Sequence, residues 1–218
     1  MNYLLQPYNY DLSDPASIPN LFLDHLYLVG ITMLISLIIA LPLGILVARR
    51  PRLYLLVITI ADLLYTVPAL ALIAILITIT GLSLATAIIP LVIYTQLVLI
   101  RNTATAINGI DPLLLEVGKA MGMNPRQVLL RVALPQALPT IIAGVRIATV
   151  TTIGIAALAY LAGQSGLGDL IFKNIVTHDF DAVVAGGILI ALLAVVADLL
   201  LLAVQTVLNR GRTSVSLA

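Results

Sequence analysis

The sequence has little of what a water-soluble or disulfide-stabilised protein needs. It contains no cysteine, and only 10% of its 218 residues are charged, whereas 61% are hydrophobic; the mean hydropathy is +1.14. The lack of cysteine excludes disulfides and thiolate metal sites. The shortage of charge leaves too few polar residues to cover a soluble globule of this length. We therefore predict an integral membrane protein.

Several kinds of chemistry lack the residues that they need. The stretch from Gly163 to Gly168 has the glycine spacing of a phosphate-binding loop, but Asp169 stands where a lysine would contact phosphate. The only histidines, His25 and His178, have no ligand spacing between them. We therefore expect no metal site, no bound nucleotide, no cofactor and no enzymatic activity in this chain.

Five apolar stretches are long enough to cross a bilayer, which takes about 20 largely apolar residues in a helix. They cover residues 22–48, 53–80, 84–100, 138–161 and 182–208. We predict an all-α integral membrane protein with about five transmembrane helices, in which residues 1–218 form a single transmembrane domain. An odd number of spans places the two termini on opposite sides of the membrane.

Basic residues are distributed unevenly around these stretches, and this predicts their orientation, because cytoplasmic loops retain lysine and arginine. Lys173 is alone on one side, and Arg146 lies within a span. The other side carries nine basic residues: Arg49, Arg50, Arg52, Arg101, Lys119, Arg126, Arg131, Arg210 and Arg212. We expect residues 1–20 to be an extracytoplasmic tail without a signal peptide or fused binding domain, and the C-terminus to lie inside.

Three charged residues and a proline interrupt the apolar spans. Asp62, Arg146 and Asp198 each lie roughly 15 Å from the expected cytoplasmic boundary, given the rise of a helix. Because an unpaired charge is costly there, we expect Arg146 to pair with Asp62 or with Asp198. The pair either fixes helix packing or takes part in gating or in lining a path. Pro68 should kink the second span and point towards a bundle interior, where neighbours satisfy the freed carbonyls.

Residues 111–139 form the longest interval that cannot be a helix embedded in hydrocarbon, since they hold five charged residues and four prolines. Asp111 and Asn124 are each followed by proline, the combination of N-cap and first helical residue that starts a helix. We expect Gly122 to end the first helix and Pro135 to limit the second. The interval predicts a helix-turn-helix hairpin on the cytoplasmic face.

The spacing within this hairpin is similar to that of a known loop. Glu116 and two small or apolar residues are followed after three positions by Gly122, and after nine more by residues 132–135, which end in Leu-Pro. This resembles the EAA loop of binding-protein-dependent ABC importer permeases, where two alanines follow the glutamate. The resemblance implies the fold of a type I importer permease, similar to that of methionine permeases.

The resemblance also implies partners. These are a second permease subunit, identical or similar, two cytoplasmic ATPase subunits that bind ATP and Mg, an extracytoplasmic substrate-binding protein and the lipid bilayer of the inner membrane, without nucleic acid. The hairpin would be the coupling helix in a cleft of each ATPase, with Gly118 and Gly122 allowing close approach of the partner. The expected coupling residues are Glu116, Val117, Gly118, Lys119, Ala120, Gly122, Leu134 and Pro135.

Two further stretches are similar to segments of permeases for glycine betaine, choline and carnitine. Residues 65–72 look like their Gln-Thr-Ile-Pro-Ser-Leu-Ala-Leu segment, with Tyr65 in place of glutamine, and residues 166–172 resemble a segment after their corresponding span. The resemblance implies ATP-driven import of an osmoprotectant. The alternatives are import of methionine or a polar amino acid and, from other classes, a stand-alone channel or an intramembrane enzyme.

Polar and aromatic residues in the spans are candidates for a translocation path. A quaternary ammonium favours aromatic faces through cation–π attraction, and since tryptophan is absent the candidates are Tyr65, Tyr94 and Tyr160. Their alternative role is packing or placement at the membrane interface. The candidates for the path or its gating are Asp62, Tyr65, Thr66, Pro68, Tyr94, Gln96, Arg146, Thr151, Thr152 and Asp198.

Overall fold

The computed structural model describes residues 3–210 and consists there of helices and their connections, which confirms the all-α class. The α-helices are α1 (Ile18–Ala48), α2 (Pro51–Thr66), α3 (Ala69–Thr80), α4 (Leu84–Asn108), α5 (Pro112–Ala120), α6 (Pro125–Val128), α7 (Leu134–Ala156), α8 (Gly168–Thr177) and α9 (Phe180–Arg210). A π-helical turn, Leu129–Ala133, joins α6 to α7, and a 3-10 turn, Ala157–Ala162, follows α7. Arg212 lies outside the described residues.

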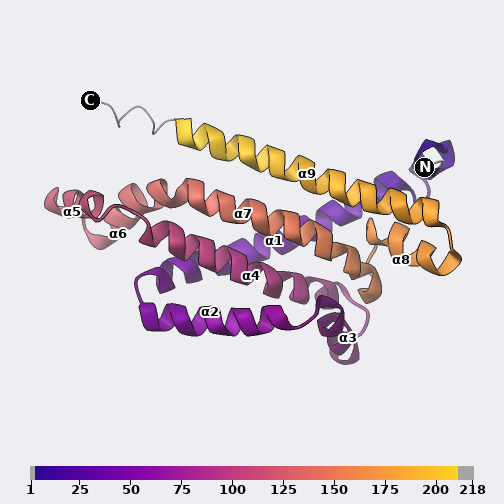
Figure 1. Ribbon diagram of the computed structural model, residues 1–218, viewed down its shortest axis with the longest axis horizontal. Helices are drawn as coiled ribbons and strands as arrows, with labels where there is room; N and C mark the ends of the chain where they lie inside the picture. Colours follow the sequence, from indigo (N-terminus) through magenta and orange to yellow (C-terminus); the bar gives the residue numbers. More distant parts are fainter. Residues whose placement is uncertain (1–2, 211–218) are drawn as a thin grey trace.

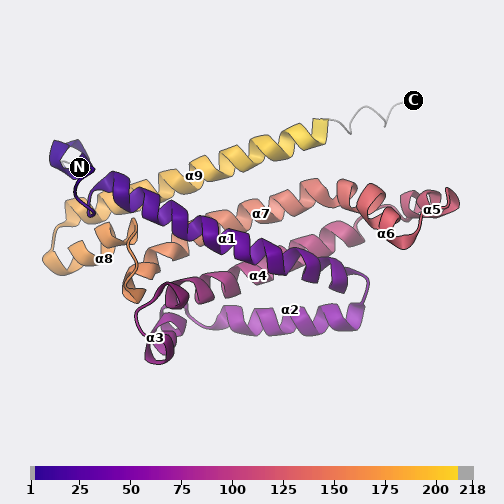
Figure 2. The same cartoon turned by 180° about the vertical axis from the view of Figure 1, so that it is seen from behind.

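The long helices form an elongated bundle, with α4 and α7 beside α1, α2 beside α4, and α9 along α7 (Figures 1 and 2). The α5–α6 hairpin projects from one end, and α3 and α8 lie at the other. The first turn of α1 and the last turn of α9 are at opposite ends of the bundle. The described chain thus crosses the bundle an odd number of times.

Small residues let the central helices approach closely, as is usual between membrane helices. A Cβ added to Gly144 on α7 would lie 2.4 Å from the Cβ of Asn102 on α4, and one added to Gly44 on α1 would lie 2.6 Å from the Cβ of Thr103. Ala104, which follows these two contact residues on α4, is fully buried. A larger side chain at either glycine would push α4 away from its neighbour.

Four helical segments are long and apolar enough to span a membrane, namely α1, α4, the continuous segment Pro125–Ala162 and α9. The pair α2 and α3 makes a fifth span if the two count as one, and they are bent by 89° at their break. The predicted count of about five therefore depends on this broken pair.

The break between α2 and α3 differs from the predicted kink. Val67 is extended, as the residue before a proline tends to be, and Pro68 starts a new helix. Pro68 is exposed within this single chain, so the other helices of the same chain do not cover it. The expected satisfaction of freed carbonyls is confirmed at Val67, whose carbonyl accepts the hydroxyl of Tyr94 from α4.

Pro135 does not limit the second hairpin helix, so that prediction is wrong. The helix runs from Pro125 through Pro135 to the end of α7 without interruption. The π-helical turn directly before Pro135 explains this, because its wider winding replaces the i to i−4 pattern in which a proline ring clashes. The hairpin is therefore rigidly continuous with the fourth predicted span.

The third span is longer than predicted, because α4 continues to Asn108 rather than ending near residue 100. Arg101 consequently lies inside α4, two turns before its end, and not in a cytoplasmic loop. This corrects the distribution of basic residues: eight, not nine, remain on the predicted cytoplasmic side, against Lys173 alone on the other.

Candidate functional site

The hairpin begins and turns where the sequence predicts. The Asp111 carboxylate accepts the Leu113 backbone N–H at 2.9 Å and caps α5. Gly122 has a φ of +82°, which a residue with a side chain rarely adopts. Asn124 and Gln127 form a capping box at the start of α6, with two hydrogen bonds of 2.9 Å. These local contacts fix the projecting hairpin (Figure 1).

Gly118 serves the packing of the hairpin itself rather than the approach of a partner, so that part of the prediction is wrong. The residue is buried. A Cβ at this position would lie 3.4 Å from a methyl carbon of Val132 and 3.5 Å from one of Val128. The small residue thus lets α5 lie against the π-helical turn and α6.

An apolar stripe runs along the outer face of α5. Leu113 is 61% exposed, Val117 49% and Met121 71%. Because these residues are spaced by four, they share one face of the helix, and the hairpin projects beyond the spans. An exposed apolar stripe on such a projection is typical of a docking surface.

The other predicted coupling residues are mostly exposed. Glu116, Lys119, Ala120, Gly122 and Pro135 are exposed, and Leu134 is partly buried. Sequence reasoning included Val117 but missed Leu113 and Met121. Their spacing of four on either side of Val117, in a segment outside the spans, is the signal that reveals them.

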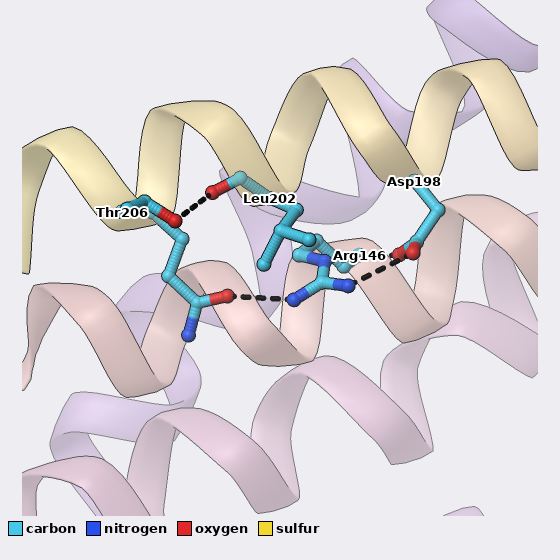
Figure 3. A network of polar contacts seen from close by, with 5 residues as sticks. Arg146, Asp198, Leu202 and Thr206 are labelled. Carbon is cyan, nitrogen blue, oxygen red and sulfur yellow. Dashed lines mark hydrogen bonds and ion pairs between the residues drawn. The ribbon is translucent and has the colours of Figure 1, made fainter.

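Arg146 on α7 is bound to α9 by three hydrogen bonds (Figure 3). Its Nε and Nη2 donate to the two carboxylate oxygens of Asp198 at 2.9 and 2.8 Å, and its Nη1 donates to Gln205 Oε1 at 2.8 Å. Gln205 Nε2 in turn donates to the Pro139 carbonyl at 3.1 Å. The pairing with Asp198 is confirmed, and Gln205 is a member of the network that sequence reasoning missed.

Asp62 pairs with Arg101 on α4, so the alternative pairing with Arg146 is wrong. Arg101 Nη2 donates to the two carboxylate oxygens at 2.8 and 3.0 Å. Both side chains are about half exposed, 48% for Arg101 and 49% for Asp62. The apolar stretch ends at residue 100, so the sequence predicts a loop position for Arg101 and gives no sign of this pairing. The three predicted intramembrane charges therefore do not meet in one cluster.

Tyr65 and Tyr94 come together, whereas Tyr160 lies elsewhere. The rings of Tyr65 and Tyr94 meet edge to face with centroids 5.4 Å apart. Tyr94 is only 6% exposed and its hydroxyl is used at the helix break, while Tyr65 is 41% exposed. Tyr160 stacks on Phe172 of α8 at a centroid distance of 6.0 Å. Tyr65 is thus the tyrosine of the three with an exposed ring, and it follows Asp62 by three residues on α2.

The polar candidates are mostly bonded within their own helices. The hydroxyls of Thr66, Thr151 and Thr152 donate to carbonyls three or four residues earlier, at 2.7, 2.9 and 2.7 Å. Thr152 is 2% exposed and packs towards α1, so it offers no surface to a path in this chain. Gln96 Nε2 reaches the Ser36 carbonyl on α1 at 3.4 Å. Thr66 remains exposed next to Tyr65.

A cavity of about 310 Å³ opens where α4 ends and α5 and α7 begin. Thr105, Gln136 and Thr140 contribute polar atoms to its lining, together with Asp111 at the N-cap of α5. Thr105 follows Arg101 by one helical turn on the same face of α4. The Asp62–Arg101 pair is therefore followed, towards the hairpin, by a second polar surface.

Residues 40–213 match the family model described as the inner membrane component of binding-protein-dependent transport systems. The chain belongs to this family. It is a multi-pass inner membrane permease subunit, and ATP is hydrolysed by a separate ATPase subunit. A binding protein and an ATPase are accordingly its partners. No cofactor belongs to the permease itself.

Individual relatives cover nearly the whole chain. It is 40% identical over 210 residues to the carnitine transport permease protein OpuCD of Listeria monocytogenes, covering 96% of this chain and 94% of that one. It is 43% identical over 181 residues to the glycine betaine/carnitine/choline transport system permease protein OpuCD of Bacillus subtilis, with 83% and 79% covered. The osmoprotectant import permease protein OsmW of Salmonella typhimurium is 37% identical over 206 residues, with 92% and 96% covered.

A solved structure agrees with the fold. An inward-facing structure of the MetNI methionine ABC transporter superimposes with a TM-score of 0.76 at 23% identity, covering 85% of this chain and 93% of that one. This confirms the predicted likeness to methionine permeases at the level of fold.

Proposed function

We propose that this permease forms the path by which an osmoprotectant carrying a quaternary ammonium, such as glycine betaine, choline or carnitine, enters the cell. The observation that carries the proposal is the identity of 37–43% with permeases that are named for these compounds or for osmoprotectants. The exposed Tyr65 ring beside Asp62 supports it, because aromatic faces and carboxylates both attract a quaternary ammonium.

We further propose that two copies of the chain assemble with two ATPase subunits. A twofold arrangement would present two identical α5–α6 hairpins. The apolar stripe of Leu113, Val117 and Met121 would fill a cleft on each ATPase, with Glu116 and Lys119 at its edge. The continuous helix from α6 into α7 would then carry a movement of the ATPase directly into the bundle.

We also propose an orientation. Seven basic residues of the described chain lie at or near the hairpin end, against Lys173 at the other, and this favours a cytoplasmic hairpin. The start of α1 would then be extracytoplasmic and the end of α9 cytoplasmic. The hairpin, proposed to span residues 111–139, would be the ATPase-facing part of a single transmembrane domain.

The substrate test is ATP hydrolysis in proteoliposomes that hold this permease with its co-encoded ATPase and binding protein. Glycine betaine, choline, carnitine and methionine are added in turn. We expect stimulation by one or more of the quaternary ammonium compounds. Stimulation by methionine alone would replace this proposal with methionine import, and absence of an ATPase complex would contradict the proposed assembly.

The docking surface can be tested in the same complex. Val117→Glu places a charge in the centre of the apolar stripe, and we expect the ATPase to be lost when the permease is purified. Arg126→Gln, at an exposed position on α6, is the matched control and should retain it. Retention of the ATPase by Val117→Glu would show that the stripe is not the docking surface.

A further inference from the structure

We propose that Asp62, Tyr65 and Arg101 form a transient binding site, within the translocation path, for a zwitterion that carries both a quaternary ammonium and a carboxylate. Arg101 would take the carboxylate, and Asp62 with Tyr65 would take the ammonium. This inference rests on the proposed function and deepens it, because it distinguishes zwitterions such as carnitine and glycine betaine from choline, which has no carboxylate.

The depth and exposure of the ion pair favour a path rather than lipid. Asp62 lies eleven residues after the start of α2 and Arg101 seven before the end of α4, so both are roughly 10–16 Å along their helices from the hairpin side. Each side chain is about half exposed. Charges facing hydrocarbon at that depth are costly, and intramembrane ionisable residues usually face a water-filled cavity or another protein surface.

Arg101 has donors available for a second carboxylate. Both of its hydrogen bonds to Asp62 come from Nη2. An arginine has five N–H donors in a planar fork, and within residues 3–210 no acceptor for Arg101 Nε or Nη1 is found. A substrate carboxylate can therefore accept a charge-assisted hydrogen bond from Nε or from Nη1 while Nη2 stays near Asp62.

The cationic end of the zwitterion would lie between Asp62 and Tyr65. These residues are three apart on α2 and so share one face of the helix. The Tyr65 ring is 41% exposed and is held by its edge-to-face contact with Tyr94. Tyr94 is in turn anchored by its hydroxyl on the Val67 carbonyl. The ring is thus held beside a carboxylate, with part of its surface accessible to a quaternary ammonium.

A bound zwitterion would replace the Asp62–Arg101 ion pair by two new ion pairs, one at each of its ends. When the substrate carboxylate binds Arg101, the substrate ammonium approaches Asp62, so no charge is left without a counter-ion. Choline would bring the ammonium alone and leave the Asp62–Arg101 pair intact. From Arg101 the next helical turn carries Thr105 at the polar cavity beside the hairpin, which offers water-accessible surface on the route inward.

The test uses the complete complex in proteoliposomes and measures substrate import and ATP hydrolysis together. In Arg101→Gln we expect import of carnitine and glycine betaine to fall about tenfold or more, as for loss of a charge-assisted hydrogen-bonded pair. Import of choline, where the wild type imports it, has no carboxylate contact to lose and should fall much less. Hydrolysis stimulated by the loaded binding protein should also fall much less than import of the zwitterions, because the ATPase docks at the hairpin. Arg101→Lys keeps the charge and should import more zwitterion than Arg101→Gln.

Each other result overturns an identifiable statement. Unchanged import of zwitterions by Arg101→Gln, or a parallel fall of import and ATP hydrolysis in both Arg101 variants, would overturn the site and leave the proposed function standing. Equal import by the Lys and Gln variants would show that the positive charge has no role. A wild-type complex that imports none of the three compounds would instead overturn the proposed function.

Discussion

Two arginines on neighbouring helices of the same bundle each bind one aspartate, but they do so differently. Arg146 uses three of its nitrogens, two on Asp198 and one on Gln205, and its side chain is 21% exposed. Arg101 uses one nitrogen, on Asp62, and is 48% exposed. All three nitrogens of the first guanidinium donate within the protein, whereas Nε and Nη1 of the second have no acceptor in the described chain.

The difference separates a structural role from a functional one. The Arg146 network joins α7 to α9 (Figure 3). It continues through Gln205 to the Pro139 carbonyl, so every member serves helix packing. The Asp62–Arg101 pair joins α2 to α4 beside the 89° break, and it leaves room for another charged group. The sequence predicted an ion pair of Arg146 with Asp62 or with Asp198, and only the structure reveals Arg101 as the partner of Asp62.

The largest expected effect is the loss of Arg146. In Arg146→Ala the Asp198 carboxylate remains between membrane helices without its counter-ion, and we expect the yield of folded permease in detergent to fall several-fold. Combining it with Asp198→Asn removes that orphaned charge and should recover much of the yield. Equal losses in the single and double variants would contradict the assignment of this pair to helix packing.

A smaller effect is expected when Arg146 loses only its hydrogen bond to Gln205. Gln205→Leu removes the acceptor of Arg146 Nη1 and the donor to the Pro139 carbonyl, at a cost of about 1–2 kcal/mol for polar groups left unsatisfied. Thermal unfolding of the purified permease measures the change. Thr206→Val, on the next position of α9, is the control, because its hydroxyl bonds only the Leu202 carbonyl of its own helix and is exposed. A similar shift in both variants would contradict a role for the network.

Loss of Arg101 should affect stability still less. Its pair with Asp62 is half exposed, and exposed ion pairs contribute little to stability. We expect the yield of folded Arg101→Gln to be within about twofold of wild type. A loss as large as that of Arg146→Ala would remove the distinction between the two arginines, and with it the argument that Arg101 faces water.

Local contacts explain which parts of the fold were predictable. The caps at Asp111 and Asn124 and the turn at Gly122 depend on residues within four positions, so the sequence predicts the hairpin well. The count of spans follows in the same way from runs of apolar residues. The prediction that Pro135 limits the helix is wrong because it assumed α-helical geometry before the proline. The π-helical turn Leu129–Ala133 has a different hydrogen-bond pattern.

Contacts between residues far apart in the sequence explain which parts of the fold were not predictable. Asp62 lies 39 residues from Arg101, and the sequence suggested Arg146 instead, because it gives the depth of a residue along a helix but not the direction of its side chain. Gly118 was expected at a partner surface, but its side of α5 faces Val132. The spacing of Leu113, Val117 and Met121 predicts that they share one helix face. That this face is exposed, and so could dock a partner, follows only from the structure.

The smallest expected effect concerns Asp169, a carboxylate outside the membrane-spanning helices without a bidentate partner. It lies in the first turn of α8, where burial raises the pKa of its carboxyl to about 6. Asp24 raises this pKa further, while the backbone at Gly166 and the charge of Lys173 oppose the shift. Asp169 Oδ1 is buried and has no partner within the described chain. Burial therefore favours the protonated form of Asp169.

A raised carboxyl pKa predicts that stability decreases as pH rises. Between about pH 4 and pH 6 the unfolded chain has already released this proton while the folded protein still holds it, so folding becomes less favourable over that interval. We expect the midpoint of thermal unfolding in detergent to fall by a few degrees from this group, and Asp169→Asn to reduce the fall. Asn174→Gln, an uncharged change on the same helix, should leave the slope unaltered. If the unfolding midpoint depended on pH identically in Asp169→Asn and wild type, the buried carboxyl of Asp169 would not hold its proton in this interval. Lys173 would then serve as its counter-ion, as Arg101 and Arg146 do for Asp62 and Asp198.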